Sequence, residues 1–281
     1  MLTKIFFQNT TIEINQKGAE LFQIHKDNTT YIWDVNPQFW NKTSPILFPI
    51  VGSLKDNNFF VENKIYSLLR HGFARDYNFN LIEKLENKAV FSLMYNKETL
   101  KIFPFEFELQ IIYIVDEDGI KINYVVKNLS NQKMPFSIGA HPAFKIEGNI
   151  ENYSLEFENI ENLITYHLEN DLLNNKTSII PLENNQLKLN YNLFEKDAII
   201  LKNNTTSFVK LLKNNELVLK IIFKDFPFLG IWTKKDAPFI CIEPWYGIAD
   251  SNNANGNIYE KEGIQILDID CEFYSEIFIE L

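Results

Sequence analysis

Two residues that precede a proline have side chains suited to moving protons. His141 precedes Pro142, and Glu243 precedes Pro244 directly after the apolar run Phe-Ile-Cys-Ile. A residue before proline is pushed toward extended backbone, which holds its side chain at a strand end with little freedom. A carboxylate at the end of a buried run is costly without a partner, and desolvation raises its pKa toward that of a useful base. The pair is therefore a candidate for general acid–base chemistry; the alternative is that each proline only ends a strand.

His71 and Trp245 are candidates for binding a ligand near that pair. His71 precedes a glycine in an aromatic context, although a hydrogen-bonded structural histidine also fits this pattern. Trp245 lies two residues after Glu243 and is followed by a tyrosine. Sugars have apolar C–H faces that pack on flat rings, so an aromatic beside a carboxylate suits a carbohydrate, and an ordinary core aromatic is the alternative. His25 and His167 lie in polar segments and are assigned structural or surface roles.

Short β-strands must position these side chains. Residues 1–34 alternate apolar and polar side chains in bursts that turn residues interrupt. The segments 79–86 and 89–96, and likewise 105–115 and 119–128, are predicted to form hairpins. No stretch sustains a helical period, and many short strands follow in the second half. We therefore expect an all-β fold, a sandwich or a barrel.

The chain shows no linker, repeat or shift in composition, so we predict a single domain over residues 1–281. Segment 46–52 contains a proline and follows another, which favours extended backbone. Residues 245–263 are rich in glycine and asparagine and are expected to form a loop at the rim of a sheet, where function is often located. The Asn-rich segment 169–176 is attributed to composition and is assigned no function.

The composition argues against several classes of partner. The formal net charge is -10, and Arg70 and Arg75 are the only arginines, so we expect no nucleic acid and no anionic membrane surface as partner. No run approaches the roughly 20 apolar residues of a membrane-spanning helix. The two cysteines, Cys241 and Cys271, make neither a disulfide framework nor a zinc knuckle, which predicts a reducing, cytoplasmic location.

Three motifs in fixed order resemble one family. They are His-Gly-Phe-Ala-Arg at 71–75, Gly-Ala-His-Pro-Ala-Phe at 139–144 and Ile-Glu-Pro-Trp-Tyr-Gly at 242–247. Together they resemble the aldose 1-epimerase (galactose mutarotase) family, more narrowly its LacX-type bacterial branch, from about residue 6 to the C-terminus. The resemblance implies a large antiparallel β-sandwich of the galactose mutarotase-like (supersandwich) type. It also implies an isomerase that interconverts the α and β anomers of an aldose such as galactose or glucose, as a monomer or homodimer, without a metal or organic cofactor.

The resemblance also implies roles for individual residues. The general base of the family falls on Glu243 and the general acid on His141. The second histidine, which contacts the sugar near its ring oxygen, falls on His71, and the substrate-binding aspartate falls on Asp197. We expect the carboxylate and the imidazole to face each other across a gap as wide as a pyranose ring, with Trp245 as the aromatic platform.

One departure from the family pattern leaves the substrate open. Related sequences carry an arginine, which helps hold sugar hydroxyls, at the position of Ser53, and Arg75 is the candidate replacement. Loss of that arginine motivates a first alternative, a sugar-binding or sensor protein without activity. A second alternative is a hexose-6-phosphate 1-epimerase, for which Arg70 and Arg75 are the only arginines available to hold phosphate.

A third alternative is a metalloenzyme. His71, His141 and Glu243 together would make a His₂Glu zinc site. The two histidines, however, lack the close paired spacing of zinc-protease motifs. The sequence therefore favours proton transfer by Glu243 and His141 without a metal.

Overall fold

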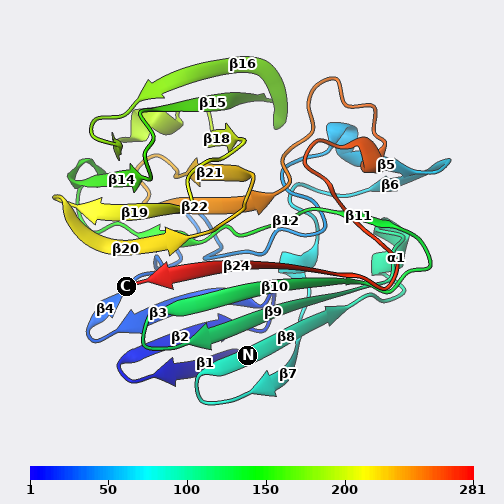
Figure 1. Ribbon diagram of the computed structural model, residues 1–281, viewed down its shortest axis with the longest axis horizontal. Coiled ribbons are helices and arrows are strands. Elements are labelled where there is room, and N and C mark those ends of the chain that lie inside the picture. Colours follow the sequence, from blue (N-terminus) through cyan, green and yellow to red (C-terminus); the bar gives the residue numbers. More distant parts are fainter.

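The structure, a computed structural model, describes residues 1–281 and consists almost entirely of β-strands (Figure 1). The 24 strands form five sheets, and every pairing between strands is antiparallel. Helical structure is limited to α1 (Thr99–Ile102) and the 3₁₀ turns η1 (Lys55–Asn57), η2 (Ala74–Asp76), η3 (Ile150–Asn152), η4 (Tyr191–Phe194) and η5 (Ile258–Glu260). The expected all-β architecture is confirmed, and no helix is long and apolar enough to cross a membrane.

The largest sheet has nine strands in the order β17-β14-β19-β20-β24-β10-β9-β8-β7. The last strand, β24, lies between β20 and β10 (Figure 1), so one sheet contains strands from both halves of the chain. The single domain predicted over residues 1–281 stays a prediction, with which this arrangement agrees. The strands are β7 (Asn80–Lys84), β8 (Lys88–Met94), β9 (Phe107–Val115), β10 (Ile120–Asn128), β14 (Tyr153–Phe157), β17 (Gln186–Lys188), β19 (Phe208–Lys213), β20 (Glu216–Ile222) and β24 (Glu272–Glu280).

A seven-stranded sheet has the order β12-β22-β21-β18-β15-β16, with β13 also paired to β22. Its strands are β12 (Ile138–Gly139), β13 (Ala143–Lys145), β15 (Asn162–Glu169), β16 (Leu172–Pro181), β18 (Ile199–Lys202), β21 (Phe228–Trp232) and β22 (Phe239–Tyr246). The smaller sheets contain β1 (Leu2–Phe7), β2 (Thr10–Asn15), β3 (Glu20–Lys26) and β4 (Thr29–Thr30); β5 (Asn58–Val61) and β6 (Lys64–Ser67); and β11 (Met134–Phe136) and β23 (Gln265–Leu267).

The burial of each strand follows its sequence pattern. In β9, fully buried and half-buried residues alternate along all nine positions, as expected for a strand with one face on the core. Strand β22 differs, because seven of its eight residues are buried. A continuous apolar run of this kind belongs to a strand covered on both faces. The buried apolar residues form one cluster of 66 members and a smaller one of eight.

The predicted hairpins are confirmed as β7–β8 and β9–β10. The predicted loop 245–263 was wrong at its start, because Trp245 and Tyr246 still belong to β22 and pair with Gly139 and Ile138. Segment 46–52 forms no strand, only isolated bridges. Segment 169–176 contains the turn between β15 and β16, in which only residues 170 and 171 separate the two strands.

Candidate active site

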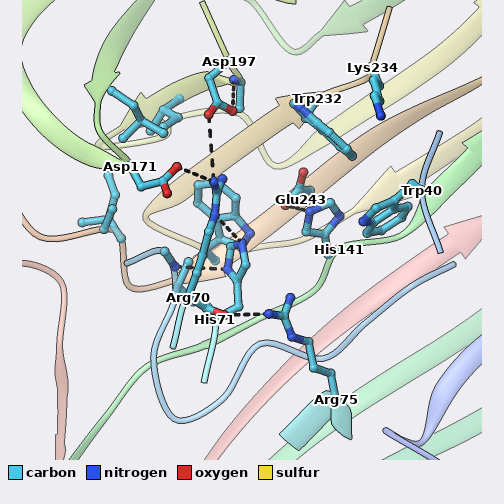
Figure 2. Close-up of a pocket in the computed structure, with 18 of the residues that line it drawn as sticks. Trp40, Arg70, His71, Arg75, His141, Asp171, Asp197, Trp232, Lys234 and Glu243 are labelled. Carbon is cyan, nitrogen blue, oxygen red and sulfur yellow. Dashed lines mark hydrogen bonds and ion pairs between the residues drawn. The ribbon is translucent and has the colours of Figure 1, made fainter. Parts of the chain in front are cut away.

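A cavity of about 550 Å³ lies beside strand β22. Its lining comes from segments spread over most of the chain, and Figure 2 shows the side chains converging from different strands and loops. A cavity of this size holds a small ligand such as a sugar. All of the residues that the sequence indicated as site candidates line it: His71, Arg75, His141, Asp197, Glu243 and Trp245.

Strand register brings His141 and Glu243 together. Strand β12 pairs with β22 through Gly139 and Trp245, and β13 pairs with the earlier part of β22. His141 lies in the short gap between β12 and β13, so it falls opposite Glu243. His141 Nε2 lies 3.2 Å from Glu243 Oε2, and Oε2 accepts no hydrogen bond, so this contact lacks the alignment of one. Both residues are buried, with 8% and 2% of their surface exposed.

The expected gap between the two groups is absent. Their side chains touch, and Figure 2 shows them as neighbours on one wall of the cavity. The expectation was wrong because adjacent strands of a sheet lie only about 4.7–4.9 Å apart. His141 and Glu243 occupy opposing positions on two such strands, so their side chains share one face.

Burial disfavours charge on both members of the pair. It lowers the pKa of His141 to about 3, and the guanidinium groups of Arg70 and Arg75 add to this effect. Burial also raises the pKa of Glu243 well above its usual value, against the opposing influence of Arg70. Both shifts favour the uncharged forms, and because the two groups touch, they titrate as a coupled pair whose proton belongs to both.

Aromatic rings enclose the imidazole of His141. The Trp40 ring stacks on it, with centroids 4.9 Å apart and planes 30° apart. Trp232 meets it edge-on at 5.8 Å, and His71 does so at 5.9 Å. Trp40 and Trp232 also line the cavity. These rings exclude water from the imidazole and give the cavity an apolar wall on that side.

His71 is held in place by its own backbone and by Gly52. The His71 amide donates to the Gly52 carbonyl at 2.9 Å, and the Gly52 amide donates to His71 Nδ1 at 3.1 Å. Gly52 has φ 72°, and a Cβ there would collide with Ala249, so the close approach requires glycine. Burial, aided by Arg70, lowers the pKa of His71 well below its usual value, so the ring is neutral. Both ring nitrogens face donors, because Arg70 Nε also donates to His71 Nε2 at 3.2 Å.

The indole ring of Trp245 packs directly on strand β21 at Gly230, which has no side chain. Trp245 pairs with Phe228 on β21, and a Cβ on the adjacent Gly230 would overlap the indole ring. Trp245 is 5% exposed, and its Nε1 is buried with no aligned hydrogen-bond acceptor. Its ring therefore forms part of the cavity floor, beside Glu243 of the same strand.

Arg70, Asp171 and Asp197 gather at one side of the cavity, away from Trp40 and Trp232 (Figure 2). Arg70 Nη1 lies 2.7 Å from Asp171 Oδ1 and 4.0 Å from Asp197 Oδ2. Asp197 also accepts a hydrogen bond from the next backbone amide. Arg75 Nη2 donates to the Arg70 carbonyl at 2.7 Å, which holds the backbone from which Arg70 extends. Arg70 Nε lies 3.2 Å from His71 Nε2.

Sequence reasoning missed Asp171, Trp40 and Trp232 as lining residues. Asp171 belongs to the Asn-rich segment that we dismissed. A signal for the rings did exist, because the chain has four tryptophans and three of them line this cavity. Ser53, at the position of the family's arginine, does not line it, whereas Arg70 and the proposed replacement Arg75 do.

The zinc site considered from the sequence is not assembled as expected. His71 Nδ1 is occupied by a backbone amide, and its Nε2 faces the cationic side chain of Arg70. Neither atom is therefore free to bind a metal ion. A different group of three buried side chains, His141, Cys241 and Glu243, has ligand atoms within 4.8 Å of one another.

Comparison with known proteins identifies the family. The aldose 1-epimerase family model matches residues 3–264. The chromosomal LacX protein of Lactococcus lactis subsp. lactis is 38% identical over 272 residues, covering 90% of this chain and 89% of that protein. The plasmid-encoded LacX protein of the same organism is 38% identical over 269 residues, with the same two coverages.

Two solved structures have the same fold as this chain. A galactose mutarotase related enzyme from Lactobacillus acidophilus superimposes with a TM-score of 0.94 at 30% identity, over 100% of this chain and 97% of that one. A galactose mutarotase-like protein from Lactobacillus casei ATCC 334 gives a TM-score of 0.92 at 29% identity, over 100% and 99%. The fold is therefore the galactose mutarotase-like β-sandwich, and the chain belongs to the aldose 1-epimerase family, with LacX proteins among its relatives.

Proposed function

We propose that this protein is an aldose 1-epimerase, an isomerase that interconverts the α and β anomers of a free aldose. The observation that carries the proposal is the contact between His141 Nε2 and Glu243 Oε2, 3.2 Å apart in the wall of a cavity large enough for a sugar. A carboxyl group and an imidazole that share one proton can remove a proton and deliver another.

The short distance between the two groups suits the reaction. Anomer exchange removes a proton from the C1 hydroxyl and delivers one to the ring oxygen, and both oxygens are bonded to the same carbon. With the proton of the pair on His141, Glu243 is proposed to accept the hydroxyl proton and His141 to protonate the ring oxygen. The ring then opens, the C1–C2 bond rotates, and closure on the other face of the carbonyl reverses both transfers. Each positioned acid or base contributes about 10²–10⁴-fold.

The rest of the cavity suits a neutral sugar. The Arg70 guanidinium, which His71 helps to hold through Nε2, is a donor for sugar oxygens, whereas Asp171 and Asp197 accept from hydroxyls. Trp245 offers a flat apolar face to the C–H groups of the ring. The ligand proposed is a hexose such as galactose or glucose.

The charges give little support to a 6-phosphosugar. Arg70 is already paired with Asp171, and Arg75 donates to a backbone carbonyl. Lys234 lies near the carbonyls of Gln38 and Phe39. Each cation of the cavity thus has a partner, while a phosphate needs several converging on it.

Polarimetry of freshly dissolved α-galactose and α-glucose, each compared with its 6-phosphate, tests the proposal. Faster approach to the equilibrium rotation with an unphosphorylated sugar is the expected result. Binding without acceleration would instead assign a sugar-binding or sensor role, and preference for the phosphate would assign the hexose-6-phosphate reaction.

A cytoplasmic location is part of the proposal. Cys241 and Cys271 are both free thiols, as a reducing compartment maintains them. Whether the protein is a monomer or a homodimer is a question for gel filtration.

A further inference from the structure

Cys241 has a buried thiol that the proposed acid–base mechanism does not use. It lies two residues before Glu243 on β22, so both side chains point to the same face of the strand. Its thiol, a ring nitrogen of His141 and a carboxylate oxygen of Glu243 all lie within 4.8 Å of one another. His141 and Glu243 line the cavity, and Cys241, which does not, completes the group from the protein interior.

The spacing of the pair resembles that of ligands around one metal ion. Nitrogen and oxygen ligands about 2.0–2.1 Å from a tetrahedral zinc ion lie roughly 3.3 Å from each other. His141 Nε2 and Glu243 Oε2 are 3.2 Å apart. One imidazole, one thiolate and one carboxylate form a ligand set typical of Zn²⁺, with the fourth position facing the cavity. Mg²⁺ and Ca²⁺ prefer oxygen ligands and are disfavoured.

The carboxylate of Glu243 has an oxygen atom without a hydrogen-bond partner. Glu243 Oε2 is buried and accepts no hydrogen bond. An unsatisfied buried carboxylate is unfavourable, and a bound cation would satisfy it. A thiolate and a carboxylate together carry two negative charges, which would neutralise a divalent ion in this buried position.

We propose that His141, Cys241 and Glu243 bind one thiophilic divalent cation of the Zn²⁺ type, and that this ion inhibits the enzyme. The cation takes the lone pairs that the acid–base pair needs for proton transfer. Coordination displaces the thiol proton and the proton shared by His141 and Glu243, and both pass to solvent without any redox change. Only the inhibition rests on the proposed epimerase function; cation binding does not.

Cobalt(II) is the probe for binding, because a thiolate ligand gives it a near-ultraviolet charge-transfer band. Metal-free protein is titrated with Co²⁺ and then with competing Zn²⁺, for the wild type and for Cys241→Ala. Cys271→Ala is the matched control, because it removes the other, exposed thiol. Glu243→Gln removes a second ligand with little change of shape, so the test stands even if Cys241→Ala fails to fold.

We expect the wild type and Cys271→Ala each to bind one Co²⁺ per chain and to show the thiolate charge-transfer band. Cys241→Ala should not show this band. Loss of either ligand should weaken Co²⁺ binding by about tenfold or more. Even the loss of a residue that only hydrogen-bonds to a metal ligand typically lowers metal affinity by about 10–100-fold. Zn²⁺ should slow mutarotation reversibly, with chelator restoring the rate, whereas Mg²⁺ should not. A spectrum without the thiolate band, or equal affinity in wild type and Glu243→Gln, would overturn the site. Tight binding without inhibition would overturn the regulatory role alone.

Discussion

Arg70 and Asp171 form an ion pair, Nη1 to Oδ1 at 2.7 Å, across the polar side of the cavity. Arg70 directly precedes His71, and Asp171 lies at the turn between β15 and β16. The pair therefore joins the tip of a hairpin to the loop that carries a proposed sugar-binding histidine. It sets the direction of the guanidinium in the cavity.

Asp171→Asn should weaken sugar binding and leave the chemical step unchanged. Both side chains are partly exposed, and pairs of this kind contribute about 0–1 kcal/mol, so the free energy of unfolding should change by less than about 1 kcal/mol. Misdirection of Arg70 should raise KM about two- to tenfold at constant kcat, the pattern of lost uniform binding. Polarimetry over a range of sugar concentrations measures both constants. Glu98→Gln, which breaks the exposed pair with Lys101, is the control, and a fall in kcat alone would refute this role.

Trp40→Ala should reduce activity by exposing the His141 imidazole to water. The stacked contact at 4.9 Å is worth about 0.5–1.5 kcal/mol, which corresponds to about a two- to tenfold loss in kcat/KM. Trp40→Phe keeps a ring at this position and should retain most of the activity. If the two variants have equal rates, the ring does not support the imidazole.

Gly52→Ala should disturb His71 as well as the fold. Its φ of 72° disfavours any side chain, and a Cβ would collide with Ala249. Gly148→Ala is the matched control, because Gly148 has φ 84° and open space around it. The control should lose about 1–3 kcal/mol of unfolding free energy from backbone strain alone. Gly52→Ala should lose more unfolding free energy than the control, measured by chemical denaturation, and should also lose mutarotase activity, measured by polarimetry. Equal losses of stability and of activity in the two variants would contradict this role of Gly52.

The pH dependence of mutarotation should reflect the single proton shared by His141 and Glu243. Burial lowers the pKa of His141 to about 3, so a second proton joins the pair only in strong acid. Burial raises the pKa of Glu243, so the last proton leaves only well above the usual carboxyl range. Arg70 lowers the pKa of both groups, Arg75 also lowers the pKa of His141, and Asp197 raises the pKa of Glu243. We expect kcat/KM to stay level through mildly acidic pH and fall at high pH, whereas a rise with a midpoint near 6.5 would indicate an ordinary histidine.

The strands and the two residues of the proposed proton-transfer pair could be predicted from the sequence because both have local signals. Period-2 alternation marks β9 and β10, and the X-Pro pair at His141 marks the gap between β12 and β13. Glu243 lies inside β22 rather than at a strand end, because Pro244 does not end that strand. The distance between His141 and Glu243 was not predictable from spacing. It follows from the register of β12 and β13 on β22, which depends on contacts far apart in the chain.

The polar and aromatic surroundings of the pair had weaker signals. Asp171 lies in a two-residue turn, Asn170-Asp171, in which both residues have positive φ. Such a turn predicts a hairpin, yet nothing local predicts that its tip reaches Arg70. Trp40 lies in a loop, and it reaches the site by packing against His141 and Phe239, which are far away in the chain.

Glu243→Gln tests the central claim most directly, because it keeps the size of the side chain and removes its ability to accept a proton. Mutarotation of α-galactose or α-glucose, followed by polarimetry, is measured beside equilibrium sugar binding by calorimetry. The account predicts a fall in rate of about 10²–10⁴-fold with sugar binding still measurable. Turnover at the wild-type rate in this variant would contradict it.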